Sequence, residues 1–293
     1  MDTRPKLAVL GLGTMGRGMA GSALRNGIST VVWNRELDIA RQMADQGAEV
    51  ALSAVDAVKG VDVVITMVTN TEAVTSIAVD LGVLEALPPG AVWAQMSTIG
   101  VEGTATISSI VEKERSDILF LDAPVSGSKV PAEEGKLVIF ASGSEKARPI
   151  VEPVFDAIGQ RTVWLGPIGA GSRMKLVNNT LLAFSAEGVA NSLALARRLG
   201  LDVRSVLDAF EGGPLISQWA VGKISRIESD NYSPEFPLAL ALKDVHLALE
   251  EADPERFAVL ARLAREWEQL VDQGLGSEDV TVVTRALEVS TPD

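Results

Sequence analysis

The sequence contains no cysteine and a single histidine, His246. The absence of cysteine excludes disulfides, thiolate nucleophiles and metal sites with cysteine ligands. With one histidine, a multi-histidine metal site is impossible, and a Ser-His-Asp triad would have to use His246. No metal is therefore expected, and any acid–base chemistry is expected from other side chains.

Positive charge and long apolar runs are also scarce. The chain has 26 Lys and Arg against 39 Asp and Glu, a formal net charge of −13. This balance argues against nucleic acid as the main partner, because phosphate binding needs a basic face, but it allows an anionic small molecule. No apolar run approaches the roughly 18 residues of a membrane span. The N-terminus MDTRPKLAVLGLG lacks the features of a signal peptide, so a cytoplasmic protein is expected.

The first half of the chain alternates short apolar runs with helix-like segments. Continuous apolar strands that alternate with helices predict a parallel sheet covered on both faces. The expected strands are 7–13, 30–34, 61–68, 91–97, 118–125, 136–143 and 161–166, and the expected helices are 14–26, 36–46, 72–79, 101–115 and 145–158.

The second half has helical patterns and no convincing strand. A pattern with few breakers runs from about 167 to 199, and shorter ones cover 203–210, 238–251, 255–272 and 278–288. The predicted fold class is α/β, with a doubly wound sheet over 1–166 and an all-α domain over 167–293. The all-α domain includes a long interdomain helix, which we expect to lie in an interface because one domain cannot easily cover it.

A glycine-rich loop follows the first expected strand and opens the first expected helix. In LGLGTMG, Gly11 permits a tight turn, Gly13 lets the backbone approach a pyrophosphate, and Gly16 lets the helix pack close to the strand. The context predicts a Rossmann-type dinucleotide site in preference to a plain turn. The residues expected to contact the cofactor here are Gly11, Leu12, Gly13, Thr14, Met15 and Gly16.

The second expected strand ends in Asn34 and Arg35, where NAD-binding proteins usually place an acidic residue. The planar guanidinium of Arg35 suits the 2′-phosphate of NADP. A solvated arginine, or NAD binding through Glu36, is the alternative. The pattern favours NADP.

Two further segments combine polar and small residues. Ser126, Gly127 and Ser128 follow a strand, and their N–H and hydroxyl groups could hold a carboxylate, although a plain turn is an equal alternative. In GSRMKLVNNTLLAF, Lys175 and Asn179 share one helix face. An ammonium group in apolar surroundings can protonate a developing alkoxide. A solvent-facing lysine with Asn178 and Asn179 as caps is the alternative.

Lys243 and Asp244 lie inside an expected apolar helix, with His246 one turn beyond Lys243. An ordinary amphipathic helix would have the same pattern. His246 by itself is expected to be structural or exposed.

Together these segments resemble the β-hydroxyacid dehydrogenase family. GLGTMG (11–16), MSTIG (96–100), DAPVSGS (122–128), GAGSRMKLVNN (169–179) and FPLALALKD (236–244) match the family's motifs in order. Within the family, SGSKVPAEEGKL is similar to the glyoxylate/succinic semialdehyde reductase branch, which prefers NADPH.

The resemblance implies a role for each matching residue. Lys175 would be the general acid in reduction and the base in oxidation, and Asn179 would orient the lysine or the substrate. The implied substrate contacts are Thr98, Ser126, Gly127, Ser128, Phe236 and Asp244. Besides the glycine loop, the implied cofactor contacts are Asn34, Arg35, Met67, Val68, Thr69, Thr98 and Lys243.

The resemblance also implies a homodimer or a dimer of dimers, and an NADPH-dependent reductase of small carboxylate-bearing carbonyl compounds. Two alternatives stay open. Imine reductases share the fold and the VWNR segment (32–35) but generally lack the lysine that this chain has at 175. A non-catalytic NADP-binding module is the other alternative, against which the full set of polar motifs argues.

Overall fold

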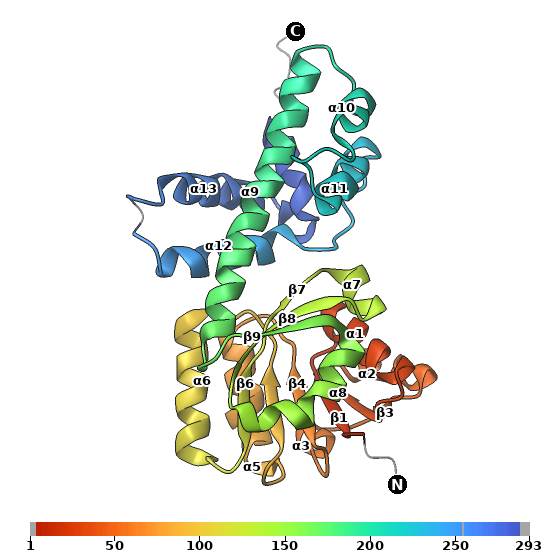
Figure 1. Cartoon of the computed structure of the whole chain (residues 1–293), viewed down its shortest axis with the longest axis vertical. Helices are drawn as coiled ribbons and strands as arrows, with labels where there is room; N and C mark the ends of the chain where they lie inside the picture. Colours follow the sequence, from red (N-terminus) through yellow and green to blue (C-terminus); the bar gives the residue numbers. More distant parts are fainter. Residues whose placement is uncertain (1–3, 254, 288–293) are drawn as a thin grey trace. The chain divides into compact units, whose positions relative to one another are not determined.

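The computed structural model describes residues 4–253 and 255–287, and the chain divides into two compact units, Met1–Lys175 and Leu176–Asp293 (Figure 1). Unit 1 combines a sheet with helices, and the described part of unit 2 is helical, which confirms the predicted fold class. The boundary between the units falls inside α9 (Ala170–Arg198). The functional boundary expected at residue 166 stays a prediction.

The sheet of unit 1 has the strand order β3-β2-β1-β4-β5-β6-β8-β7, with β9 paired to β8. The strands β1 to β6 are parallel, as predicted for all of them except β3, which the sequence analysis did not include. Their bounds, with those of the last three strands, are β1 Leu7–Leu10, β2 Thr30–Trp33, β3 Glu49–Val50, β4 Val63–Thr66, β5 Val92–Gln95, β6 Leu119–Asp122, β7 Val125–Ser126, β8 Leu137–Gly143 and β9 Gly159–Trp164.

The strand β8 departs from the prediction because it runs antiparallel to β6 and β7. The connection from β6 to β8 contains only the two-residue β7 and one short helix, α7 (Lys129–Glu134), so the chain returns without a long crossover. The next crossover carries the 11-residue helix α8 (Arg148–Ile158), and β9 is accordingly parallel to β8.

Both faces of the sheet are buried because the strand residues are apolar in both directions. In β1, Leu7 and Val9 join one core cluster, and Ala8 and Leu10 join the other. Successive side chains of a strand point to opposite faces, so this alternation requires helices on each side. The first cluster contains residues of α1 (Thr14–Arg25), α2 (Leu37–Arg41), α7 and α8, and the second contains residues of α3 (Ala54–Ala57), α4 (Thr71–Thr75), α5 (Val83–Ala86) and α6 (Gly100–Glu114).

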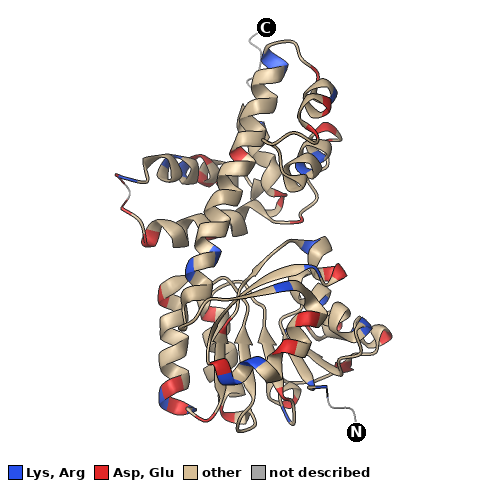
Figure 2. Cartoon of the chain, viewed as in Figure 1, with Lys and Arg blue, Asp and Glu red and all other residues tan. Residues whose placement is uncertain are grey.

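Charged residues lie mainly on the helices and loops around the sheet (Figure 2).

Two predicted helices of unit 1 are shorter than expected. The helix expected over 36–46 is α2 followed by the 3₁₀ turn η1 (Ala44–Gln46), and the one over 72–79 is α4 followed by the π-helical η2 (Ser76–Asp80). The 3₁₀ turn η3 (Glu145–Ala147) precedes α8. The short elements β3, α3, α5 and α7 were not predicted, because segments of two to six residues give no readable period.

In unit 2, α9 is followed by α10 (Val203–Phe210), α11 (Gln218–Glu228), α12 (Leu238–Glu250) and α13 (Ala258–Asp272). The helices expected over 203–210, 238–251 and 255–272 are confirmed, and α11, which has Gly222 in its interior, was missed. The 3₁₀ turn η4 (Leu275–Ser277) follows α13. The helix expected over 278–288 is the 3₁₀ helix η5 (Val280–Leu287), and its expected last residue lies outside the described residues.

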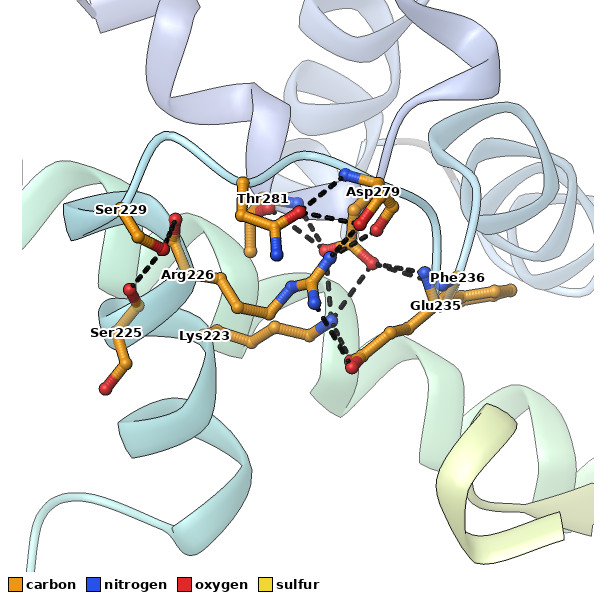
Figure 3. Close-up of polar contacts among 10 residues, drawn as sticks. Lys223, Ser225, Arg226, Ser229, Glu235, Phe236, Asp279 and Thr281 are labelled. Atoms are coloured by element: carbon orange, nitrogen blue, oxygen red, sulfur yellow. Dashed lines mark hydrogen bonds and ion pairs between the residues drawn. The ribbon is translucent and has the colours of Figure 1, made fainter. Parts of the chain in front are cut away.

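A buried ion cluster holds α11 to the segment that leads into α12 (Figure 3). The Nζ atom of Lys223, whose residue is 3% exposed, lies 3.0 Å from both carboxylate oxygens of Asp279 and 2.9 Å from Glu235 Oε2. Burial alone would raise the pKa of Asp279, but the ammonium of Lys223 and hydrogen bonds from the backbone outweigh it and lower the pKa. In the described part of the chain, no helix has the length and apolar composition to cross a bilayer.

Candidate active site

The glycine loop leaves the N-terminus of α1 open, as an anion site requires. Gly11 has φ +97°, and a Cβ there would lie 2.4 Å from Met67 O, while a Cβ on Gly16 would lie 1.9 Å from Gly11 O. Gly13 is the N-cap residue of α1, and no side chain at this position occupies the first N–H groups of the helix. A Cβ on Gly13 would meet no atom within 4 Å. No acidic residue lies in the first turn of α1. The exposed backbone at Gly13 and Thr14 therefore fits a pyrophosphate.

Asn34 supports this loop from the end of β2. Its Oδ1 accepts a hydrogen bond of 2.9 Å from Leu12 N, and its Nδ2 donates to Glu36 O at 3.3 Å. Arg35 is exposed, and within residues 4–253 and 255–287 its guanidinium has no hydrogen-bond or ion-pair partner. Asn34 is thus a support of the loop, and Arg35 is available to a ligand.

The backbone after β4 lies beside the glycine loop, and the backbone after β5 is hydrogen-bonded to the segment after β4. Met67 N donates to Leu10 O at 2.9 Å, so Met67 to Thr69 follow the strand next to β1. Val68 N donates to Ser97 Oγ at 2.9 Å, and Ser97 N donates to Gln95 Oε1 at 2.7 Å. Ser97 and Gln95, which the sequence analysis did not single out, hold the backbone that leads into half-buried Thr98.

The turn expected to hold a carboxylate follows β7. Ser126 pairs with Val138 in β8, Gly127 is exposed with φ +133°, and Ser128 is the N-cap of α7. A Cβ on Gly127 would lie 2.7 Å from Leu137 Cδ2, so the turn needs glycine both for its φ angle and for space. Ser128 has no side-chain cap hydrogen bond to α7.

Lys175 is buried rather than facing solvent, and the solvent-facing alternative is therefore wrong. The residue is 9% exposed, and its Nζ donates a hydrogen bond of 2.7 Å to Val125 O. Val125 directly precedes Ser126, so the ammonium group lies beside the strand that leads into the small-residue turn. The glycine loop, the turn at Ser126–Ser128 and Lys175 all belong to unit 1.

Unit 2 contains the other predicted residues. Asn179 is 3% exposed, its Nδ2 donates to Asp244 Oδ2, and its Oδ1 accepts from Asn178 Nδ2 at 2.8 Å. Asp244 Oδ1 lies 3.0 Å from Lys243 Nζ, a charge contact whose geometry is not that of a hydrogen bond. Asn179 is therefore a buried partner of α12 and not a helix cap.

The candidate Phe236 and the single histidine, His246, differ in their surroundings. The backbone of half-buried Phe236 is held from both sides, because its N–H donates to Asp279 Oδ2 at 3.1 Å and its carbonyl accepts from Val280 N at 2.9 Å. His246 is exposed, with Nε2 3.1 Å from Glu268 Oε1, which confirms the expectation that it is structural or exposed.

Asp122 opens the DAPVSGS motif, but the sequence analysis assigned no role to its carboxylate. Asp122, the last residue of β6, is 0% exposed and binds the first turn of α9 through Ser172. The sequence contains one indirect signal for this role. PIGAGS (167–172) has no Ser, Thr, Asp or Asn directly before the start of α9, so the first N–H groups of the helix need a partner from elsewhere in the chain.

Taken by themselves, the groups of unit 1 can perform three tasks. The open start of α1 can bind a phosphate group, the turn at Ser126–Ser128 can bind a carboxylate, and Lys175 can exchange a proton with an oxygen atom.

Two family models match the chain. The model described as the NAD binding domain of 6-phosphogluconate dehydrogenase matches residues 6–166, and the one described as NAD-binding of NADP-dependent 3-hydroxyisobutyrate dehydrogenase matches residues 169–287. Among curated proteins, glyoxylate/succinic semialdehyde reductase 1 of Arabidopsis thaliana is 33% identical over 288 residues, which are 97% of this chain and 99% of that protein.

Solved structures have the same fold. The crystal structure of 3-hydroxyisobutyrate dehydrogenase from Salmonella typhimurium is 27% identical, covers 96% of this chain and 99% of its own, and superposes with a TM-score of 0.87. The imine reductase from Myxococcus stipitatus in complex with NADP⁺ is 20% identical, covers 97% of this chain and 100% of its own, and has a TM-score of 0.67. At that identity the second likeness concerns the fold alone.

Proposed function

The chain belongs to the β-hydroxyacid dehydrogenase family, and we propose that within it the protein is an NADPH-dependent reductase of short aldehyde or keto acids such as glyoxylate and succinic semialdehyde. Family membership bears out the resemblance seen in the motifs and the expected enzyme class, an NAD(P)-dependent oxidoreductase acting on CH–OH groups. The likeness to the Arabidopsis reductase supports the narrower substrate class because it extends over 97% of this chain.

One observation carries the proposal: the ammonium group of Lys175 is buried and hydrogen-bonded to the carbonyl directly before the Ser126–Ser128 turn. A carboxylate bound at that turn would bring the neighbouring carbonyl group of a short acid close to Nζ. Val125, whose carbonyl binds Lys175 Nζ, directly precedes the turn expected to hold the carboxylate. This closeness favours small acids, in which the carboxylate and the reacting carbonyl are few bonds apart.

The residues around the glycine loop would hold a nicotinamide dinucleotide, which when bound would supply the hydride for the carbonyl carbon. Ser126 and Gly127, with Thr98, hold the carboxylate of the substrate. Lys175 donates a proton from Nζ to the carbonyl oxygen as negative charge develops there, and in the reverse direction it takes the hydroxyl proton. The roles expected for Asn179, Phe236, Lys243 and Asp244 stay predictions.

Replacement of Lys175 by alanine tests the mechanism. Loss of a general acid is expected to lower kcat by about 10²- to 10⁴-fold. The dissociation constant for NADPH, measured by fluorescence titration, is expected to stay within about twofold of wild type. Lys113→Ala is the matched control, because it removes a lysine whose side chain is 82% exposed in α6. A near-normal kcat in Lys175→Ala would sink the proposal.

The substrate class is tested with a panel of glyoxylate, succinic semialdehyde and a cyclic imine. Oxidation of NADPH, followed by its absorbance, is expected with the two acids and to depend on Lys175. Turnover of the imine alone would replace the proposal by imine reduction. No turnover of any carbonyl compound or imine would leave a cofactor-binding module without catalysis.

The preference for NADPH is proposed because the exposed guanidinium of Arg35 has no partner among the described residues and because position 34 is asparagine instead of an acid. Loss of a charged hydrogen bond to the 2′-phosphate, worth about 1.5–3 kcal/mol, predicts that Arg35→Asp raises KM for NADPH by about 10- to 100-fold. KM for NADH is expected to change little. Arg41→Asp, which removes an exposed arginine of α2 paired with Asp38, is the control. An unchanged preference would defeat the assignment.

We also propose the homodimer and the cytoplasmic location that the sequence led us to expect. Exposed apolar residues at helical spacing on the unit 2 part of α9 support an interface, since Val177 is 66%, Leu181 68% and Phe184 39% exposed. Light scattering coupled to gel filtration is expected to give twice the monomer mass of 30.9 kDa or a multiple of that. A monomer would contradict the proposed assembly.

A further inference from the structure

Asp122 binds the first turn of α9 with both carboxylate oxygens. Its Oδ2 accepts a hydrogen bond of 2.8 Å from Ser172 N, and its Oδ1 accepts one of 2.7 Å from Ser172 Oγ. Asp122 is the last residue of β6, and Ser172 is the third residue of α9, separated from it by 50 positions in the sequence. A carboxylate at this end of a helix also interacts favourably with the helix dipole.

The same turn is fixed by two further hydroxyl groups. Ser142 Oγ, from β8, accepts from Gly171 N at 2.9 Å and donates to Asp122 Oδ2 at 3.1 Å. Thr104 Oγ1, from α6, lies 2.8 Å from Ser172 Oγ. A Cβ on Gly171 would lie 2.3 Å from Phe140 O, so the helix start fits closely against the sheet.

Lys175 follows Ser172 by three residues, almost one turn of helix. Lys175 Nζ donates its hydrogen bond to the carbonyl oxygen of Val125, which lies three residues after Asp122 in the same DAPV segment. This segment therefore fixes the start of α9 at one end and the lysine side chain at the other. Any shift of the helix start relative to β6 would move Lys175 Nζ relative to Val125 O.

From this geometry we infer that Asp122 is a positioning residue for the reaction, because it holds the first turn of α9 so that Lys175 Nζ stays on Val125 O. The inference rests on the proposed function of Lys175. Asp122 itself touches neither substrate nor cofactor in this scheme, and its whole effect on turnover passes through the lysine.

The cost of burying Asp122 supports a specific task for it. Burial raises the pKa of its carboxyl group, against the hydrogen bonds of Ser172 and Ser142, which lower it. A neutral cap from a neighbouring serine or asparagine would satisfy the first N–H groups of an ordinary helix without burying an acid. The acid binds α9 to β6 instead, which a local cap would not do.

A double-mutant cycle separates positioning from a purely structural role. Asp122→Ala is expected to lower kcat by about 10²-fold, the size of effect that a misplacement of about 1 Å produces. In a Lys175→Ala background the same change is expected to leave the residual kcat unaltered, because effects that pass through one group do not add. An equal loss in both backgrounds, or no loss in the wild-type background, would overturn the inference.

Asp122→Asn is the rescue variant. The amide oxygen of the asparagine, in the place of Oδ2, can accept from Ser172 N, and its NH₂ group, in the place of Oδ1, can donate to Ser172 Oγ. The kcat of this variant is therefore expected to lie within about tenfold of wild type. A loss as large as that in Asp122→Ala would contradict positioning by hydrogen bonds. If Asp122→Ala does not fold, Ser172→Ala takes its place in the cycle.

The matched control is Asp202→Ala in unit 2. Asp202 caps α10 by the same pair of contacts, to the backbone N–H and the hydroxyl of Ser205 at 2.9 and 2.6 Å. Its loss is expected to lower the melting temperature while kcat and the dissociation constant for NADPH stay unchanged. The two proposals fail separately: a near-normal kcat in Lys175→Ala refutes the function, whereas an inactive Lys175→Ala beside a fully active Asp122→Ala refutes only the positioning role.

Discussion

Replacement of Gly13 by alanine is expected to weaken NADPH binding while the fold of unit 1 stays intact. Gly13 has φ −64° and ψ −170°, which any residue adopts, and an added Cβ would meet no atom within 4 Å. Alanine is a poorer N-cap than glycine, at a cost of roughly 0.5–1 kcal/mol. It also restricts the unfolded chain, which stabilises the fold by about 0.4–1 kcal/mol. These two effects nearly cancel.

The effect on binding is larger because the methyl group would stand where a phosphate oxygen approaches the first turn of α1. Loss of one hydrogen bond to a charged oxygen is worth about 1.5–3 kcal/mol, which raises the dissociation constant by about 10- to 100-fold. Gly16→Ala is the contrasting variant. Its Cβ would lie 1.9 Å from Gly11 O, so it is expected to destabilise the loop itself.

Urea unfolding and fluorescence titration with NADPH measure the two quantities on the same samples. For Gly13→Ala we expect a free energy of unfolding within about 0.5 kcal/mol of wild type and the weaker binding derived above. Unchanged binding would refute the approach of a pyrophosphate to Gly13. A large loss of stability would refute the steric reasoning.

Two further predictions concern acids of unit 2, buried Asp279 and half-buried Glu187. Asp279→Asn removes one of the two carboxylates that face the buried ammonium of Lys223, while Glu235 Oε2 stays at 2.9 Å, and is expected to cost about 1–3 kcal/mol of unfolding free energy, measured by urea denaturation. The exposed Asp56→Asn should cost far less, and an equal loss in both variants would contradict this. Glu187, which accepts a hydrogen bond of 2.6 Å from Trp267 Nε1, has its pKa raised by burial in spite of that bond. Its contribution to stability is therefore full below its ordinary pKa of 4.5 in the unfolded chain and is lost as the pH rises through the higher folded pKa. The stability of Glu187→Gln relative to wild type is expected to increase over that pH range, and a pH-independent difference would refute it.

The parts of the fold that the sequence predicts well are those whose signal is local. Gly11, Gly13 and Gly16 follow an apolar strand and open a helix, a spacing that the sequence shows directly. The close contact of Gly16 with Gly11 O is also local, whereas the contact of Gly11 with Met67 O joins residues far apart in the sequence. The strands β1, β2, β4, β5 and β6 are short runs without polar interruption, as buried parallel strands are. The antiparallel direction of β8 has no such signal, because it depends on how the chain turns after β6.

The burial of the candidate site could not be predicted from local pattern. The surroundings of Lys175 depend on Val125, 50 residues earlier, and those of Asn179 depend on Asp244, 65 residues later. A helix-start lysine and two asparagines have the same sequence whether they face water or a neighbouring element. Asp122 stands at the end of an apolar run and is part of a recognisable motif, yet its partner Ser172 is equally distant.

The hydrogen bond between Leu12 N and Asn34 Oδ1 has a consequence for how the preference for one cofactor could evolve. An aspartate at position 34 would accept the same N–H, but its second oxygen would face the acceptor Glu36 O in place of the present donor. The exchange of asparagine for aspartate needs a single nucleotide change. The acid that suits the ribose hydroxyls of NAD is thus one step away, and Leu12 N keeps its acceptor when it arises.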